Sequence, residues 1–163
     1  MIVTTPPGLY TALMKAAVHP QSIAILDFGG QYAHLIASRI RRFGHPAYIY
    51  AADTNPTELQ GVAGIILSGG PQSVYEKGSP QANPKILELG IPVLGLCYGH
   101  QWLAHALGGK VTPGKTKEYG ETMVERLGET AVFKGLPKMM TVWMSHGDEV
   151  SGLSQGFIST AKS

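Results

Sequence analysis

The single cysteine of this 163-residue chain, Cys97, lies in the stretch Gly95-Leu96-Cys97-Tyr98-Gly99. The spacing Gly-x-Cys-x-Gly is typical of a nucleophile elbow, a sharp turn between a strand and a helix that exposes a nucleophilic side chain. The helix that follows would present its N-terminal N–H groups and partial positive charge to the sulfur, which favours the reactive thiolate. The alternative is a small buried core residue, the usual state of cysteine. The elbow spacing favours the nucleophile.

A thiolate that attacks a carbonyl group needs hydrogen-bond donors for the oxyanion that forms. The backbone N–H of Tyr98, directly after the cysteine, is placed to be one donor. A second glycine-rich turn, Gly69-Gly70, follows an apolar run and is expected on an adjacent strand. The sequence therefore predicts an oxyanion site made from two backbone segments.

The segments that must position these residues alternate between strand and helix. Apolar runs predict four strands, at 22–28, 46–50, 62–68 and 92–96. Helical spacing and turn signals predict four helices, at 32–43, 56–59, 84–89 and 99–107. Because the strands are apolar nearly throughout, we expect an α/β fold with an open, mostly parallel sheet and helices on both faces.

The pattern changes after residue 109, where the segments become shorter. Three of them predict a short antiparallel ribbon: 122–127, 131–133 and 140–145, the last followed by a loop at 146–148. Residues 1–21 contain Pro6, Pro7 and Pro20, and Lys15 interrupts their apolar stretch, so neither a signal peptide nor a transmembrane helix is expected there. We interpret them as a loose extension before a single domain at 22–163.

Charge and cysteine content narrow the classes of partner. The 13 basic and 11 acidic residues give a net charge of only +2 with no basic stripe, so neither nucleic acid nor a membrane surface is an expected partner. A single cysteine cannot form an internal disulfide, which is consistent with a cytoplasmic location. One cysteine among scattered histidines also predicts no metal site.

Four sequence blocks together resemble the class I glutamine amidotransferase family, in the form found at the N-terminus of GMP synthases. The blocks are 25–32 (ILDFGGQY), 67–71 (LSGGP), 95–101 (GLCYGHQ) and 143–148 (WMSHGD). Their order and spacing agree with the family from about residue 22 onward. The first and last blocks separate this form from relatives such as anthranilate synthase. The resemblance implies a flavodoxin-like sheet.

The resemblance also implies a reaction, the hydrolysis of the side-chain amide of glutamine through a cysteine thioester. It assigns Cys97 as the nucleophile and the N–H groups of Gly70 and Tyr98 as the oxyanion donors. The residues it places around the glutamine are Gly69, Gln101, Ser145, His146, Gly147 and Asp148. Gln101 follows Cys97 by four residues and so shares its helical face, although it could also serve only as a polar cap on the pocket wall.

The partners implied by the resemblance lie outside this domain. Ammonia would pass to an ATP-pyrophosphatase or synthetase domain, or subunit, that aminates adenylated XMP to give GMP. ATP and magnesium belong to that synthetase, and no cofactor is expected here.

One family motif does not occur in these 163 residues: the late His-Pro-Glu that pairs with the cysteine. Residues 157–163 resemble the strand ahead of that motif. We therefore expect a domain without its C-terminal part, inactive alone and able to self-associate through an exposed sheet edge. Only His100 and His146 are close enough in the predicted site to replace the missing base, but both are disfavoured, because the helix leads His100 away from the sulfur and His146 is needed in the pocket loop.

Other interpretations remain open. The chain could be a catalytically inactive glutamine-binding or regulatory module, or the amidotransferase subunit of another pathway, such as anthranilate synthesis. A flavin-binding scaffold is disfavoured, because the turn at 29–32 (GGQY) lacks the Ser- and Thr-rich cradle that a flavin phosphate requires.

Overall fold

The computed structural model describes residues 21–163, and within one long strand it describes only the backbone of residues 115–119. The extension expected at 1–21 therefore lies outside the described residues, apart from Gln21. The described chain forms two compact units. The first contains the residues up to Pro71 together with Pro80–Gly99, and the second contains Gln72–Ser79 and His100–Ser163. Each unit is described below by itself.

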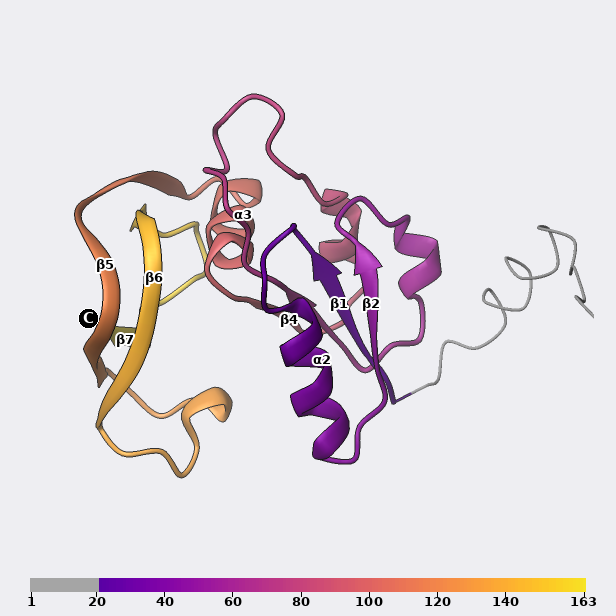
Figure 1. Ribbon diagram of the computed structural model, residues 1–163, viewed down its shortest axis with the longest axis horizontal. Coiled ribbons are helices and arrows are strands. Elements are labelled where there is room, and N and C mark those ends of the chain that lie inside the picture. Colours follow the sequence, from indigo (N-terminus) through magenta and orange to yellow (C-terminus); the bar gives the residue numbers. More distant parts are fainter. Residues whose placement is uncertain (1–20) are drawn as a thin grey trace, which may run out of the picture. The chain divides into compact units, whose positions relative to one another are not determined.

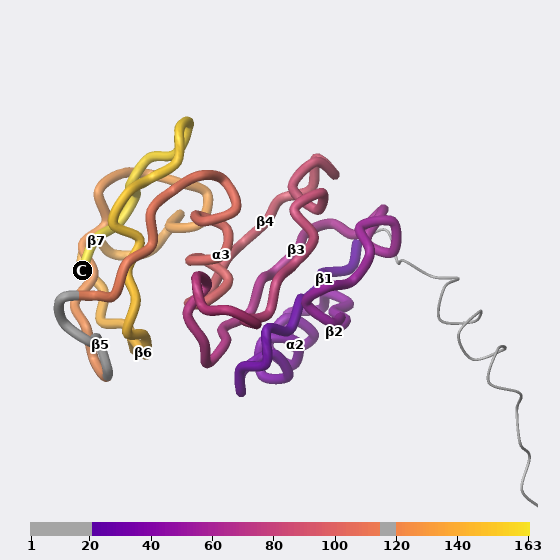
Figure 2. Tube along the Cα trace, turned by 90° about the horizontal axis from the view of Figure 1, so that it is seen from above, coloured from indigo at the N-terminus to yellow at the C-terminus, as the bar shows by residue number. Residues whose placement is uncertain are grey.

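The first unit is built on a four-stranded parallel sheet, as the apolar runs predict (Figures 1 and 2). Its strands, in the spatial order β2-β1-β3-β4, are Ala47–Ala51, Ile23–Asp27, Gly64–Leu67 and Val93–Gly95. This order is that of a flavodoxin-like sheet. β3 pairs in parallel with both β1 and β4, so the carboxyl ends of these three strands lie next to one another.

Helix α2, Ala33–Arg42, covers one face of β1 and β2 (Figure 1). Ala33 and Ala37, one helical turn apart, are buried in one cluster with Ile25 and Ala47 of the sheet. Small side chains at these two positions allow the helix to lie close to the strands. Leu26 points to the opposite face of β1 and is also fully buried. Both faces of β1 are therefore covered.

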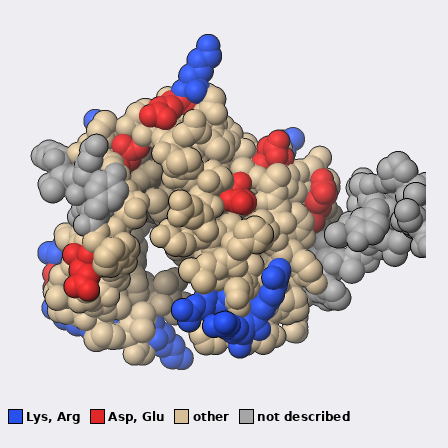
Figure 3. All heavy atoms as spheres, viewed as in Figure 1, with Lys and Arg blue, Asp and Glu red and all other residues tan. Residues whose placement is uncertain are grey.

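Three arginines occupy the last turn of α2, where basic side chains complement the negative end of the helix dipole. They are Arg39, Arg41 and Arg42, and Figure 3 shows basic side chains gathered at this end of the helix. Arg41 donates from Nε to the carbonyl oxygen of Ala47 at 2.9 Å. This guanidinium therefore has a structural role, linking the helix end to the start of β2.

Two of the predicted helices are short 3-10 helices, η1 (Pro56–Leu59) and η2 (Pro84–Glu88). Each begins with proline, which already has a helical φ angle. Each follows an asparagine that caps the first turn: Asn55 Oδ1 accepts from the Thr57 N–H, and Asn83 Oδ1 accepts from the Lys85 N–H, both at 3.0 Å. The proline and asparagine pair explains why these starts were predictable.

The second unit contains an antiparallel sheet, which confirms the expected ribbon but at much greater length. Strands β5 (Lys110–Arg126) and β6 (Met139–Gly152) run side by side, and the short β7 (Ala161–Lys162) pairs with the far end of β5 (Figures 1 and 2). The loop predicted at 146–148 is wrong, because β6 continues through these residues to Gly152. His146 and Asp148 both pair with β5, on either side of a shift in the register, and this pairing keeps the backbone extended there.

The strand predicted at 131–133 is also wrong. Ala131–Phe133 forms the 3-10 helix η3. The Phe133 N–H donates to the carbonyl of Thr130 at 3.1 Å, and the Leu136 N–H donates to the carbonyl of Phe133 at 3.0 Å. Local turn hydrogen bonds thus take up backbone groups that a strand would offer to a neighbour. In the part of the chain that the structure describes, no helix is long and apolar enough to cross a membrane.

Candidate functional site

Cys97 lies between the end of β4 and the start of helix α3, Tyr98–Ala106. Its φ angle is +51°, in the left-handed region that L-residues other than glycine rarely adopt, and its side chain is exposed. It is the one non-glycine residue with positive φ among residues 21–163. A strained, exposed residue at a strand-to-helix junction is the geometry of a nucleophile elbow.

The elbow is held by close backbone contact with the end of β3. The Gly99 N–H donates to the carbonyl of Ser68 at 3.0 Å, and a Cβ at Gly99 would lie 2.3 Å from the carbonyl oxygen of Leu67. A Cβ at Gly30, after β1, would likewise lie 2.4 Å from the carbonyl oxygen of Gly69. Only glycine fits at these two positions, so the first turn of α3 meets the end of β3 backbone to backbone, and the turn after β1 meets the turn after β3 in the same way.

The turn after β3 borders the thiol. A Cβ at Gly69 would lie 3.5 Å from the Cβ of Cys97 and 4.0 Å from its Sγ. One at Gly70 would lie 3.2 Å from Cγ of Tyr98. The structure therefore brings together four residues that the sequence assigned to catalysis or to the pocket: Gly69, Gly70, Cys97 and Tyr98.

Tyr98 is fixed by its side chain. Its ring is buried and packs on Phe28 with ring centroids 5.1 Å apart, and its hydroxyl donates to the carbonyl of Pro80 at 2.6 Å. Tyr98 is also the first residue of α3, and the first N–H groups of an α-helix have no acceptor within the helix. The anchored ring holds the backbone of this first turn next to the sulfur.

Ser68 supports the site and was not singled out in the sequence. Its buried hydroxyl accepts from the Phe28 N–H and donates to the carbonyl of Gly69, both at 3.0 Å. Asp27 accepts from the Gly29 N–H at 2.9 Å on the neighbouring turn. In the sequence, the only feature that marks Ser68 is the position of its hydroxyl between an apolar run and two glycines. Ser68 joins the β1 turn to the turn that carries Gly70.

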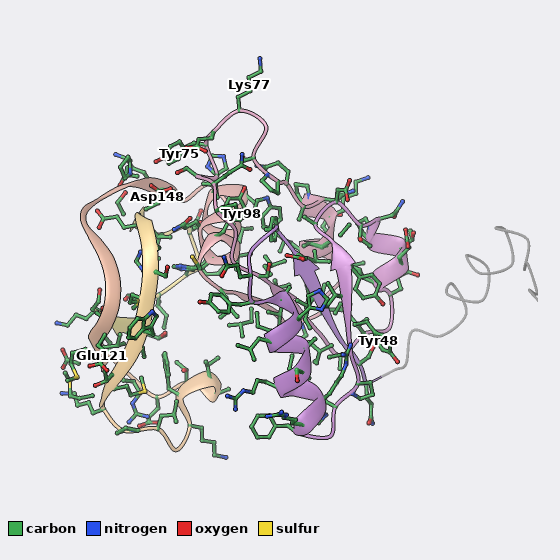
Figure 4. The ribbon with its side chains drawn as sticks, in the orientation of Figure 1. Tyr48, Tyr75, Lys77, Tyr98, Glu121 and Asp148 are labelled. Atoms are coloured by element: carbon green, nitrogen blue, oxygen red, sulfur yellow. The ribbon has the colours of Figure 1, made fainter. Side chains whose placement is uncertain are left out.

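Gln101 and Asp148, assigned to the glutamine pocket, meet in the second unit. Gln101 is buried, and its Nε2 donates to the backbone carbonyl of Asp148 at 3.1 Å. The Asp148 carboxylate accepts from the hydroxyl of Tyr75 at 2.9 Å, and Figure 4 shows these two side chains approaching each other. No sequence signal pointed to Tyr75, which is 73 residues away from Asp148.

Ser145, His146 and Gly147 precede Asp148 in β6. Side chains alternate across a strand, so His146 and Asp148 share one face of it. His146 lies near His100: the pKa of His100 is lowered from 6.5, first by desolvation of its ring and then by the charge of His146. His100 therefore favours the neutral form near pH 7. Among the side chains that the structure describes, those of residues 21–114 and 120–163, no three His, Cys, Asp or Glu are grouped so that they could hold a metal ion.

The family model described as glutamine amidotransferase class-I matches residues 24–163. The chain belongs to this family. It is 49% identical over 148 residues to a GMP synthase (glutamine-hydrolysing) of Thermomicrobium roseum, and 48% identical over 139 residues to one of Enterococcus faecalis. These alignments cover 87% and 84% of this chain. The chain spans only 27% of the length of each of these curated relatives.

One solved structure is similar to this chain in both fold and sequence. A Thermoplasma acidophilum protein, provisionally described as one subunit of a GMP synthase, has a TM-score of 0.78 and 34% identity to this chain. The similarity covers 89% of this chain and 74% of the other. The α/β fold inferred from the strand pattern is thus that of known members of the family.

Proposed function

We propose that this chain is the glutamine-hydrolysing part of a GMP synthase. Two curated relatives named GMP synthase (glutamine-hydrolysing), at 49% and 48% identity, support this choice over other class I amidotransferases. The observation that carries the chemistry is the exposed Cys97 at φ +51°, next to Gly69 and at the start of α3.

In the proposed mechanism, the Cys97 thiolate attacks the carbonyl carbon of the glutamine side chain. The carbonyl oxygen becomes negatively charged and accepts hydrogen bonds from the backbone N–H groups of Gly70 and Tyr98. The carbon–nitrogen bond then breaks, and the nitrogen takes up a proton and leaves as ammonia. Water attacks the resulting thioester, which releases glutamate and restores the thiol.

We propose that Gln101, Ser145, His146, Gly147 and Asp148 line the glutamine pocket. The 3.1 Å hydrogen bond from Gln101 to the Asp148 carbonyl supports a pocket wall shared by α3 and β6.

We further propose that ammonia passes to a synthetase domain or subunit that uses ATP and magnesium, while this domain uses no cofactor, and that the protein works in the cytoplasm.

An exposed sheet edge is also proposed as a site of self-association. β4 is the last strand in its sheet; Leu94 within it is 42% exposed, and Leu96, directly after it, is 37% exposed. Light scattering over a concentration series tests this: a monomer at every concentration would contradict it.

Glutamine protection of Cys97 tests the proposed function. Iodoacetamide should alkylate Cys97, and L-glutamine should slow the labelling in a saturable way, whereas D-glutamine should not. Intact-mass spectrometry follows the reaction, and Cys97→Ser provides the unlabelled control. Equal labelling with and without L-glutamine would refute glutamine binding at this site.

Turnover is expected to be slow for the 163-residue chain tested alone. The His-Pro-Glu motif does not occur in it, and loss of general acid–base catalysis costs about 10²- to 10⁴-fold. A fusion to the segment that follows the matched region in the Enterococcus faecalis relative should release ammonia faster by about that factor. Equal rates with and without the segment would show that another group, such as His100 or His146, acts as the base.

A further inference from the structure

The segment Gln72–Ser79 leaves the first unit directly after the Gly69-Gly70 turn and belongs to the second unit. Two buried residues, Val74 and Ser79, anchor it. The Ser79 hydroxyl donates to the carbonyl of Val74 at 3.3 Å, and the Glu76 N–H donates to the carbonyl of Ser73 at 3.0 Å. The segment is therefore an ordered loop whose own hydrogen bonds hold Tyr75 in place.

Tyr75 makes the contact between this loop and β6. Its hydroxyl donates to Asp148 Oδ1 at 2.9 Å, while the backbone carbonyl of the same aspartate accepts from the buried amide of Gln101 at 3.1 Å. Asp148 is thus held at two points, its carboxylate by the loop and its backbone by α3. A carboxylate held in this way is oriented before any ligand binds, which lowers the entropic cost of binding.

The protonation of Tyr75 is consistent with a donor role. A hydrogen bond with Ser73 lowers the pKa of the phenol, but desolvation, the hydrogen bond to Asp148 and the negative charges of Asp148 and Glu76 together raise it above 10.0. The hydroxyl therefore stays protonated near neutral pH and donates a hydrogen bond to the carboxylate.

We propose that Tyr75 is a positioning residue that orients the Asp148 carboxylate to receive the α-ammonium group of glutamine. This inference rests on the proposed function. A free amino acid differs from a glutamine residue within a peptide by its charged α-ammonium, and a fixed carboxylate is the side chain that recognises such a cation. Tyr75 acts through Asp148 and touches no reacting atom, so its effect should appear in recognition of the substrate and not in the reactivity of the thiol.

Alkylation of Cys97 by three reagents separates these effects. The first is the chloromethyl ketone analogue of L-glutamine, from which the thiolate displaces chloride. The second is the same ketone without the α-amino group, and the third is iodoacetamide. For the wild-type chain, the reagent with the amino group should react faster than its counterpart without it. Intact-mass spectrometry gives the three rates.

Tyr75→Phe removes one oxygen atom and keeps the ring. We expect it to slow labelling by the amino reagent about 2- to 10-fold and to leave the other two rates unchanged. Tyr48→Phe is the matched control, because Tyr48 is similarly exposed (39% against 47%) and lies on β2, at the opposite end of the sheet from β4 (Figure 4). It should change none of the three rates.

Each other outcome overturns the inference. An unchanged preference for the amino reagent in Tyr75→Phe would show that the hydroxyl does not position Asp148 for recognition. Equal slowing of all three reagents would show a general structural role instead, and a lowered melting temperature would accompany it. If L-glutamine protects wild-type Cys97 but the amino group gives no preference, this inference fails while the proposed function stands. If L-glutamine gives no protection, both fail.

Discussion

Gly99→Ala tests the backbone contact that holds the nucleophile elbow. The added methyl group would lie 2.3 Å from the carbonyl oxygen of Leu67 and 2.5 Å from its Cβ. Ordinary van der Waals contact begins at 3.4 Å, so the methyl group is about 1.1 Å too close to the oxygen. The oxygen belongs to the backbone of β3 and cannot rotate away, which means that the first turn of α3 must move.

The expected cost follows from two opposing effects. Overpacking a tight site costs about 1–3 kcal/mol, and the upper end applies here because the clash is with backbone. Replacing glycine by alanine within a helix returns about 1 kcal/mol through helix propensity. The net loss is about 2 kcal/mol, which for a chain of this size lowers the melting temperature by about 4–8 °C. The same movement should displace Cys97 from Gly69 and slow its reaction with a glutamine-like chloromethyl ketone.

Differential scanning calorimetry measures the loss of stability, with Gly128→Ala as the matched control. A Cβ at Gly128 meets nothing within 4 Å, and its φ is not positive. That variant should therefore be as stable as the wild type or slightly more stable. A Gly99→Ala protein that melts at the same temperature as Gly128→Ala would refute the close approach of α3 to β3.

Three further predictions concern single side chains. Cys97→Ser should leave the melting temperature unchanged, because the side chain is exposed, but should abolish alkylation. Ser68→Ala should destabilise the chain by about 1–3 kcal/mol in urea unfolding, because it removes the buried hydroxyl that accepts from the Phe28 N–H. His100 has a folded-state pKa below 6.5, so the unfolded chain binds more protons and stability falls as pH drops below 6.5. His100→Asn should flatten the loss of melting temperature between about pH 7 and 5.

The parallel sheet and the elbow could be predicted because local chemistry determines them. The four apolar runs match β1 to β4 to within two residues at each end, and the prolines at Pro56 and Pro84 mark the starts of η1 and η2. The elbow depends on the glycines on either side of Cys97. Such signals are short in sequence and need no knowledge of what packs against them.

The second unit was harder to predict, because long-range pairing determines it. β5 contains Pro113 and Gly120, residues that are unfavourable in strands, yet both are paired with β6, Pro113 with Asp148 and Gly120 with Met144. The same pairing continues β6 through His146 and Asp148, where the sequence suggested a loop. Ala131–Phe133 shows the opposite case: apolar residues without a partner strand form a 3-10 helix.

The site residues also divide into those that local sequence marks and those that depend on contacts between distant parts of the chain. In the proposed site, Gly69, Gly70 and Tyr98 act through backbone N–H groups or close approach, and glycine spacing is a local signal for such roles. Tyr75 acts through a hydroxyl that meets Asp148 across 73 residues, and nothing in its immediate sequence distinguishes it from a surface tyrosine. The oxyanion donors should consequently tolerate side-chain changes that preserve the backbone. Recognition of glutamine should instead depend on individual side-chain atoms, so removing the single oxygen of Tyr75 should impair recognition and leave the nucleophile intact.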